Sequence, residues 1–584
     1  MSGAELPFKL VQYLRLHAPA LAPTLRRLLL VIYVAALGIV LAALAIGRDL
    51  PLHGNIHDIF IWVNAGQFIE QGLRPHIDFS SPLGPLYLYA SYAAWRLTDN
   101  IGDIPLITGL GFAVLFGALI WAYRSYIRTW LLPEAIVLVL LLALSGRQMG
   151  ALDINLTWYG GYNRLCWIGV VVLVLVVLGK NAALLSPSKT DRMRVAILAG
   201  ALLGVTFFIK VNFFIAAGAI YGGWLIGSGA FRDLRACAVP ALLFSLAVAL
   251  ALLLGLDVAA YIRDIARAGA ARDSGAASSI FHPVAFVLAI VFLIANVITD
   301  MLIGNLRDLP GRIVLHAGIS AGIFFGIAGD FAKPLELFLI VLCYRFIDAF
   351  PQLVSRPDRE LFSVLPLSAA VIAGALIFLV VEFYSVVLTS VYRLGAYSDA
   401  KSQAITWSAP APSRKTLRLR AAHEPDDSDY TLFAEIMAKT AERDAILKAV
   451  SGVRQELFEL SNKAYAAQVD EGRDVLQRMG GLESKAVLPL EFSNPYPFLL
   501  GVRPPVGALL WYHDGTTFNG GVSTSLDEVF DRTDIVLVPH VSVDPQMRPV
   551  LNGMFERYNL RTSKFCEFHI GLYWSFYRRC TSRG

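Results

Sequence analysis

The sequence predicts a polytopic α-helical membrane protein with a small C-terminal α/β soluble domain. The 584-residue chain is 56% hydrophobic and only 16% charged, and its mean hydropathy is +0.58. Many of its apolar runs approach the length needed to cross a bilayer. Its charges are unevenly divided, since 45 of the 95 Asp, Glu, Lys and Arg residues lie in residues 396–584. Residues 1–395 are therefore expected to form the membrane part, and the remainder has the composition of a soluble domain.

The composition argues against several other classes of protein. The low charge and the abundance of apolar residues do not fit a disordered chain, and five cysteines are too few for a disulfide scaffold. The net charge of +5 comes from residues 1–395, as expected when cytoplasmic loops collect Lys and Arg. We therefore expect no nucleic-acid partner.

The apolar runs predict about eleven membrane spans and a cytoplasmic N-terminus. Residues 1–27 lack the apolar core and cleavage site of a signal peptide. Loops assigned to the inside carry 16 Lys and Arg, against 10 in the longer loops assigned to the outside, which agrees with the positive-inside rule and places the C-terminal domain outside. The predicted spans are 28–46, 105–123, 132–146, 165–179, 195–209, 211–228, 237–256, 283–304, 313–329, 335–350 and 361–390.

Residues 83–97 are predicted to form a helix in the outer interface. They are apolar enough to be a further span, but such a span would reverse the charge bias of most later loops. In the interface, Tyr87, Tyr89, Tyr92 and Trp95 would lie among the lipid headgroups.

The outer loop at residues 47–104 holds the first candidate site. Ile59, Trp62 and Phe68 recur at helical spacing, which predicts an amphipathic helix on the outer membrane surface. Asp58 lies at the N-terminal end of this helix, where the helix dipole stabilises a carboxylate. Asp58 is either a helix cap or a catalytic base at the membrane–water boundary, and spacing alone favours the cap.

The order of residues in this loop resembles the first outer loop of the GT-C superfamily of membrane glycosyltransferases, which use sugars carried on polyprenyl or dolichyl phosphate. The resemblance implies that Asp58 is the catalytic base and makes Asp78 a candidate acidic partner. Ile59 stands where many relatives have a second acidic residue. Without that carboxylate, there is less reason to expect that this loop alone binds a metal ion. The matching residues are Asp58, Gly72, Pro75, Asp78, Pro82, Gly84, Pro85 and Tyr87.

A second match lies at residues 200–214, which resemble a small-residue helix of the family that ends in a lysine at the outer face. The resemblance makes Lys210 a candidate to bind the donor phosphate. The alternative is an interface lysine that extends toward the headgroups. A lysine between two apolar runs is costly, so it is a functional candidate by default.

Two further outer loops, at residues 147–164 and 257–282, carry polar residues. In the first, Asp153 matches by position a second acidic residue of the family, and Arg164 is assigned either to a lipid phosphate or to anchoring its helix. The second is expected to be a solvated helix rather than a phosphate-binding loop. Other candidate substrate contacts are His57, Tyr162, Asn163 and Lys333.

The C-terminal part is expected to consist of a linker at residues 396–430 and an α/β domain at residues 431–584. No Gly-rich nucleotide loop follows its predicted strands. No zinc-ligand spacing is present, so the cofactor stays unknown, with a divalent cation as one option. The predicted strands are 486–492, 535–541 and 568–579.

Two cysteines in this domain, Cys566 and Cys580, are fourteen residues apart around a predicted strand. We expect them to form a disulfide. Such a bond would require an oxidising compartment.

The leading hypothesis for function is an inverting glycosyltransferase. The resemblance implies that an acceptor hydroxyl attacks the anomeric carbon of a polyprenyl-phosphate-linked sugar while Asp58 takes the proton. The sugar is left open, and so is the acceptor, which is a lipid, a glycan or a protein. The alternatives are a lipid or glycolipid transporter or flippase, which would show repeated halves and charges at mid-membrane, and a non-catalytic envelope scaffold. The composition favours a bacterial inner membrane with a periplasmic C-terminal domain.

Overall fold

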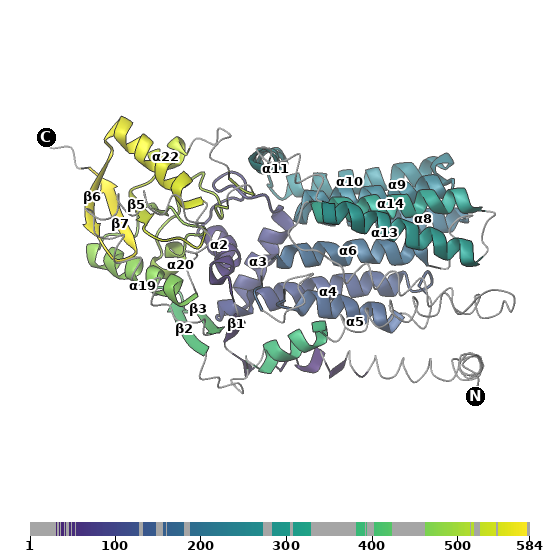
Figure 1. Cartoon of the computed structure of the whole chain (residues 1–584), viewed down its shortest axis with the longest axis horizontal. Coiled ribbons are helices and arrows are strands. Elements are labelled where there is room, and N and C mark those ends of the chain that lie inside the picture. The colour runs from purple at the N-terminus through teal and green to yellow at the C-terminus, as the bar shows by residue number, and fades with distance from the viewer. Residues whose placement is uncertain are drawn as a thin grey trace, which may run out of the picture.

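The computed structural model is mostly helical, with a small sheet-containing C-terminal region next to one end of a helical bundle (Figure 1). We call this end of the bundle the proximal end. The predicted span 335–350, and most of 28–46 and 361–390, lie outside the described residues. The structure describes residues 49–52, 54–127, 132–147, 156–158, 160–179, 187–272, 283–303, 308–328, 381–391, 393, 402–422, 462–513, 516–518, 526–544 and 547–580, and scattered positions from 31 to 47.

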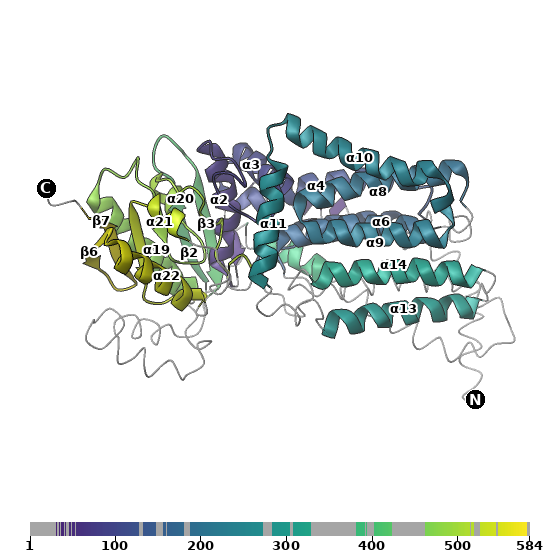
Figure 2. The same ribbon diagram turned by 90° about the horizontal axis from the view of Figure 1, so that it is seen from above.

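The bundle consists of apolar helices that run along a common axis (Figure 2). Among the described helices, α4, α6, α8, α10 and α14 are long and apolar enough to cross a membrane, and shorter apolar segments lie in α5, α9 and α13 and at Val381–Val391. The chain is therefore a helical membrane protein, while the count of about eleven spans stays a prediction. The bundle helices are α4 (Ile104–Ala122), α5 (Leu132–Leu144), α6 (Gly161–Leu178), α8 (Lys189–Ile209), α9 (Val211–Gly227), α10 (Leu234–Leu253), α13 (Pro283–Ile303) and α14 (Leu309–Ala328), with η3 (Ala230–Arg232) before α10.

The outward faces of the bundle carry large apolar side chains. Leu242, Leu246 and Leu253 of α10 are more than half exposed, as are Val114 of α4 and Val287 of α13. A soluble surface rarely gathers so much exposed apolar area, whereas a helix surrounded by lipid requires it.

Small residues bring α9 and α14 together. A Cβ atom added at Gly223 would lie 2.6 Å from the Cα of Gly318, and one added at Gly227 would lie 2.4 Å from the carbonyl oxygen of Gly311. Lipid removes the hydrophobic drive between helices, so close backbone approach at small residues stabilises their packing instead.

The first loop, residues 47–104, folds between the bundle and the C-terminal region (Figure 1). The prediction that α2 is an amphipathic helix on the membrane surface is wrong, because nearly all of its side chains are buried. α3 packs against α2, and so does α20 (Tyr496–Leu500) of the C-terminal region. The elements of the first loop are β1 (Leu50–Leu52), η1 (Ile56–Asp58), α2 (Ile59–Glu70), α3 (Pro85–Leu97) and η2 (Ile101–Asp103).

The aromatic residues of α3 also differ from the prediction. Tyr87 and Trp95 are buried rather than placed among headgroups. The ring of Tyr87 contacts Trp62 of α2, and the ring of Trp95 contacts Phe498 of α20. α3 is thus a packed part of the junction between the bundle and the C-terminal region.

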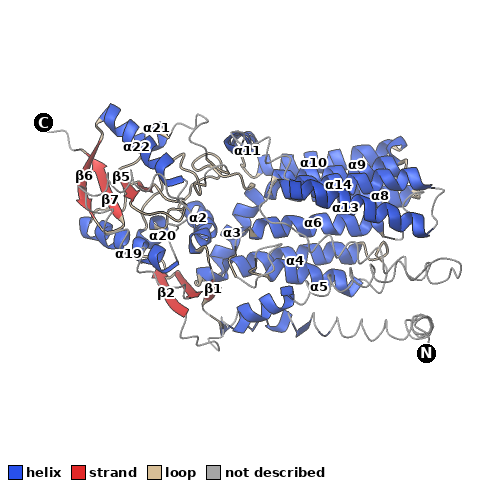
Figure 3. Ribbon diagram, viewed as in Figure 1, coloured by secondary structure: helices blue, strands red, loops and turns tan. Residues whose placement is uncertain are grey.

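Part of the predicted linker at residues 396–430 forms a sheet instead (Figure 3). β2 (Ser402–Ser408) and β3 (Thr416–Ala422) pair in antiparallel fashion, and β3 also pairs in parallel with β1 of the first loop. Leu50 lies opposite Leu419 in this register. Backbone hydrogen bonds therefore tie the C-terminal region to the first loop.

A second sheet has four strands in the order β4-β5-β7-β6. β4 and β5 are parallel, whereas β7 pairs in antiparallel fashion with both β5 and β6. The single strand predicted at 568–579 overlaps two strands of a hairpin. The first part of the predicted α/β domain, residues 431–461, lies outside the described residues. The elements are α19 (Asn462–Met479), β4 (Val487–Pro489), α21 (Asp527–Asp531), β5 (Ile535–Pro539), α22 (Met547–Thr562), β6 (Phe565–Ile570) and β7 (Trp574–Arg579).

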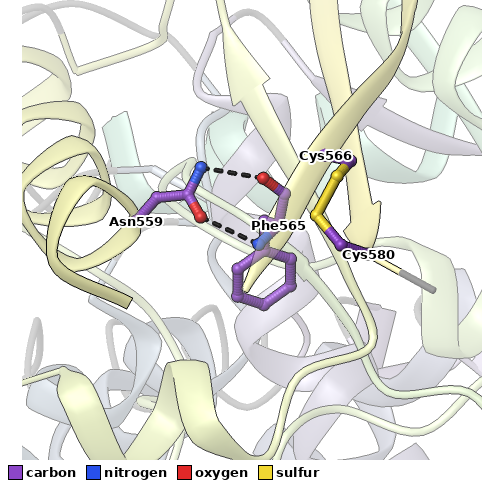
Figure 4. Close-up of a disulfide and its surroundings, with 4 residues drawn as sticks. All are labelled: Asn559, Phe565, Cys566 and Cys580. Atoms are coloured by element: carbon purple, nitrogen blue, oxygen red, sulfur yellow. Dashed lines mark hydrogen bonds between the residues drawn. A yellow bond between two sulfur atoms is a disulfide. The ribbon is translucent and has the colours of Figure 1, made fainter. Parts of the chain in front are cut away.

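A disulfide joins Cys566 and Cys580 at the open end of the β6–β7 hairpin (Figure 4). Beside it, the side-chain amide of Asn559 bonds both the backbone N–H and the carbonyl oxygen of Phe565. The hairpin is thus held to α22 as well as closed on itself. A protein disulfide of this kind persists in oxidising compartments.

Candidate active site

Asp58 lies in the first turn of a continuous helical segment that begins at Ile56. It is only 3% exposed. Its side chain makes no capping hydrogen bond to the backbone of α2, so the geometry does not support the helix-cap interpretation. Its position near the N-terminal end of the helix places it beside the positive end of the helix dipole.

His57 packs its ring against the C-terminal region. The ring centroid is 4.6 Å from that of Phe492 and 6.2 Å from that of Tyr465. Burial, together with the nearby His513, lowers the pKa of His57 to about 3. The imidazole is therefore neutral at physiological pH, and its contacts with any ligand are uncharged hydrogen bonds.

Hydrogen bonds join η1 to the C-terminal region. Ser493 Oγ donates to the carbonyl oxygen of His57 at 3.2 Å, and the N–H of Ile56 donates to Asn462 Oδ1 at 3.0 Å. The hydroxyl of Tyr465 lies 3.3 Å from Ser493 Oγ. Sequence reasoning missed these contacts because their partners are more than 400 residues apart in the chain.

Tyr465 responds to two buried carboxyl groups from different parts of the chain. Burial raises the pKa of Tyr465 far above its usual range, and the charges of Glu491 and Asp58 raise it further, against the opposing hydrogen bond with Ser493. Both carboxyl groups therefore lie close enough to act on one hydroxyl group. Tyr465 stays protonated at physiological pH.

Glu491 is the carboxyl group on the C-terminal side and is 1% exposed. Its Oε1 accepts hydrogen bonds from Ser542 Oγ at 2.6 Å and from the N–H of Phe492 at 2.8 Å. Its Oε2 is buried and has no hydrogen-bond partner among the described residues. Burial raises the pKa of Glu491 to about 7, and Asp544 adds to the rise, whereas the hydrogen bonds oppose it.

Lys210 is the single residue between α8 and α9. Its Nζ donates to Asn163 Oδ1 at 2.7 Å and lies 5.0 Å from the centre of the Tyr162 ring. The structure therefore brings together three residues that the sequence proposed separately for donor or substrate binding.

We call Lys210, Asn163 and Tyr162 the Lys210 group. Aromatic rings connect the Lys210 group to α2. Tyr162 packs edge-on against Tyr87, and Tyr87 contacts Trp62. A Cβ atom at Gly161 would lie 2.7 Å from the ring of Trp62, so the glycine leaves room for the indole. Trp62 is one helical turn beyond Asp58. Asp58 and the Lys210 group are thus linked through one side chain of α2.

Arg164 contacts the segment after α5, because its side chain donates to the carbonyl oxygen of Arg147 at 2.6 Å. Arg147 in turn forms a buried ion pair with Glu382. Arg164 therefore holds the segment after α5 in place, which agrees with the anchoring alternative.

Asp78 closes a local turn. Its carboxylate accepts a hydrogen bond from the N–H of Arg74 at 2.8 Å and pairs with the side chain of the same residue. The carbonyl oxygen of Asp78 also accepts a hydrogen bond from the N–H of Gly507 in the C-terminal region. These contacts give Asp78 a structural role. Asp153 and Lys333 lie outside the described residues.

A buried pair that the sequence did not suggest joins the first loop to α11 (Val258–Arg272). His76 Nδ1 lies 2.9 Å from Asp264 Oδ2, and the N–H of Ser81 donates to the same oxygen at 3.0 Å. α11 lies across the proximal end of the bundle (Figures 1 and 2). The prediction of a solvated helix is therefore wrong for one face of α11, because Tyr261 and Asp264 are buried.

The turn before α3 rests directly on the end of α8. The N–H of Gly84 donates to the carbonyl oxygen of Ile209 at 2.8 Å. A Cβ atom at Gly84 would lie 2.2 Å from the carbonyl oxygen of Phe208. Only glycine allows this approach, which sets the first loop against the backbone just before Lys210.

We expect Gly84→Ala to destabilise the protein by about 1–3 kcal/mol, because backbone atoms have to move to admit the methyl group. Thermal unfolding of the purified protein, followed by intrinsic fluorescence, measures the change. Gly111→Ala in α4 is the matched control, since a Cβ atom there meets nothing within 4 Å. Equal melting temperatures for Gly84→Ala and the wild type would contradict the close approach.

Glu491 is expected to make stability fall as the pH rises. The unfolded carboxyl group ionises near pH 4.5, while the folded group keeps its proton until about pH 7. The folded state therefore binds more protons in this window, and stability falls through it by up to about 3 kcal/mol.

Glu491→Gln has no carboxyl group to ionise, so its stability should not fall over this pH range. The melting temperature of Glu491→Gln minus that of the wild type should therefore grow between pH 5 and pH 8. The exposed Glu528→Gln is the control and should follow the wild type at every pH. A difference between Glu491→Gln and wild type that is constant across the range would refute the raised pKa.

Among the described residues, no group of three or more His, Cys, Asp or Glu side chains is placed to hold a metal ion. The site is therefore characterised by two buried carboxyl groups, a neutral histidine and the Lys210 group. Comparison of the sequence with protein-family models and with curated proteins finds no match.

Proposed function

We propose that the protein is an inverting glycosyltransferase, similar to the GT-C superfamily, that moves a sugar from a polyprenyl phosphate to an acceptor hydroxyl. The observation that carries the proposal is the placement of Asp58. This carboxylate is buried without capping its helix, at the junction between an apolar bundle and a polar C-terminal region. A lipid-linked donor and a polar acceptor meet at such a junction.

In the proposed reaction, an acceptor oxygen attacks the anomeric carbon while its proton passes to Asp58. The new carbon–oxygen bond forms as the bond from the anomeric carbon to the phosphate oxygen breaks. The electron pair of that bond leaves with the polyprenyl phosphate. A carboxylate base of this kind contributes about 10²–10⁴-fold to the rate.

The Lys210 group suits the leaving phosphate. Lys210 lies directly before the first residue of α9, so the partial positive charge at the helix N-terminus adds to the charge of the ammonium group. Asn163 Oδ1 holds the ammonium group near the ring of Tyr162. The phosphate of a membrane lipid stays in the headgroup layer, which explains a site at the end of the bundle rather than at its middle.

We also propose that the proximal end faces the periplasm of a bacterial inner membrane and that the N-terminus is cytoplasmic. The Cys566–Cys580 disulfide supports an oxidising compartment for the C-terminal region. The loop charges of the sequence support the same orientation.

A transporter or flippase is the main alternative, and the buried charges do not favour it. Arg147 follows the end of α5. Asp300 lies in the last turn of α13, where it pairs with Arg312 in the first turn of α14. Among the described residues, Arg147 and the Asp300–Arg312 pair thus lie at or just beyond helix ends, whereas a transport pathway needs charged groups near the membrane midplane.

We expect Asp58→Asn to lower the rate of sugar transfer by about 10²–10⁴-fold, because the amide cannot take the acceptor proton. The assay uses purified full-length protein in lipid nanodiscs, defined polyprenyl-phosphate sugars and a panel of lipid, glycan and peptide acceptors. Glu70→Gln, at the exposed end of the same helix, is the matched control and should keep the activity.

Undiminished transfer by Asp58→Asn would remove Asp58 as the base. The absence of transfer by the wild type with every donor and acceptor would contradict the glycosyltransferase proposal and support the transporter or scaffold alternatives.

We expect Lys210→Gln to weaken binding of polyprenyl phosphate in nanodiscs by about tenfold or more, because a charge-assisted hydrogen bond to the phosphate is lost. Lys189→Gln is the control, since Lys189 is exposed at the opposite end of α8. Surface plasmon resonance on the captured protein gives both affinities. Equal losses in the two variants would indicate general attraction to the membrane surface instead of a phosphate site.

A further inference from the structure

The parallel strands β4 and β5 bring two polar loops to one edge of the second sheet. Both strands run in the same direction, so the residues that follow them meet at the same edge. Glu491 lies two residues after β4, and Ser542 lies three residues after β5. In open α/β sheets, ligands bind in the crevice outside the carboxyl ends of such strands.

This edge of the sheet faces the segment that carries Asp58. Ser493 follows Glu491 by two residues and donates to the carbonyl oxygen of His57. Phe492, between them, packs its ring against the His57 ring. The carboxyl ends of β4 and β5 are therefore in direct contact with His57, the residue before Asp58.

The chemistry of the edge suits an uncharged, hydroxyl-rich ligand. Its floor is buried, with Glu491 Oε2 unpartnered among the described residues and Ser542 Oγ beside Oε1. Beside it, His513 Nδ1 lies 3.7 Å from Asp544 Oδ2, and the side chains of these residues are 36% and 14% exposed. A carboxyl group accepts a hydrogen bond when ionised and also donates one when protonated, so either state of Glu491 binds a hydroxyl.

We propose that the carboxyl ends of β4 and β5 form an acceptor subsite that binds a glycan chain through Glu491 and Ser542 and holds one of its hydroxyls toward Asp58. Only the second part of this inference, the placement of a hydroxyl toward Asp58, rests on the proposed function. Glycan binding at the edge is a separate property.

A sugar fits this edge better than an amine or a peptide. Its hydroxyls match the carboxyl and serine groups, and its C–H faces pack on aromatic rings such as those of Phe492 and His57. Burial raises the pKa of Glu491, and the neighbouring charge of Asp544 adds a smaller rise. An uncharged ligand can bind beside a protonated Glu491 without bringing a charge into the protein interior. A charged amine would need Glu491 to be ionised in order to compensate its own buried charge.

The experiment measures binding to immobilised linear oligosaccharides of two to six sugars by full-length protein in nanodiscs. Amino-terminated peptides on the same surface serve as the comparison ligands. Glu491→Gln and Ser542→Ala are the test variants, and the exposed Glu528→Gln is the control. We expect about tenfold weaker oligosaccharide binding for each test variant and no change for the control.

A second readout uses cleavage of the donor without acceptor, in which water replaces the acceptor hydroxyl. The KM for the best oligosaccharide acceptor should rise by about tenfold in Ser542→Ala, while the Glu528→Gln control should keep both the cleavage rate and the KM of the wild type. Ser542→Ala keeps the inference open to refutation if Glu491→Gln does not fold.

The outcomes separate the two proposals. Oligosaccharide binding that depends on Glu491, without donor cleavage, would leave the subsite in place and contradict the transferase. Three outcomes would overturn the proposed acceptor subsite. The wild type could cleave the donor but bind no oligosaccharide, the test variants could bind oligosaccharides as tightly as the wild type, or the protein could bind only the peptides.

Discussion

Backbone pairing between the first loop and the C-terminal region is the constraint on which the rest of the structure depends. β1 pairs with β3, and Ser80 exchanges backbone hydrogen bonds with Ala508 and Leu510. These bonds attach the first loop to the C-terminal region at two places, one before α2 in the sequence and one after it. Backbone groups at a buried junction need partners, so the two regions are stable together in this arrangement. The helix between the two attachments is consequently buried instead of free on the membrane surface.

The burial of Asp58 follows from this docking. The C-terminal region covers η1 with Tyr465, Phe492 and Ser493, and it places Glu491 within electrostatic reach of the same tyrosine. Catalytic acids and bases are commonly found where separate chain segments give two carboxyl groups different surroundings. The C-terminal region therefore contributes residues to the candidate site itself.

The sequence predicted what depends on local pattern and missed what depends on distant pairing. The helices at Ile104–Ala122 and Leu234–Leu253 follow from apolar runs close to their observed bounds. Lys210 was singled out because a charge between two apolar runs is costly, and Asp58 because it begins a predicted helix in a loop that resembles the first outer loop of a known family. The three residues of β1, Leu-Pro-Leu, are too few to show a strand period. Likewise, nothing near His76 or Asp264 indicates that they meet across 188 residues.

The proposed inversion at a sugar carbon would set a geometric demand on the segment from Asp58 to Trp62. The attacking oxygen and the leaving oxygen approach from opposite sides, so the base and the phosphate site have to flank the sugar. Asp58 adjoins the C-terminal region, and Trp62, one turn later, contacts Gly161 beside the Lys210 group. The Cβ atoms of residues four apart on a helix lie about 5–6 Å from one another, so Trp62 lies next to Asp58 on the same side of the helical segment. Trp62 therefore connects the helical segment of the proposed base to the residues beside the proposed phosphate site, through its contacts with Gly161 and Tyr87.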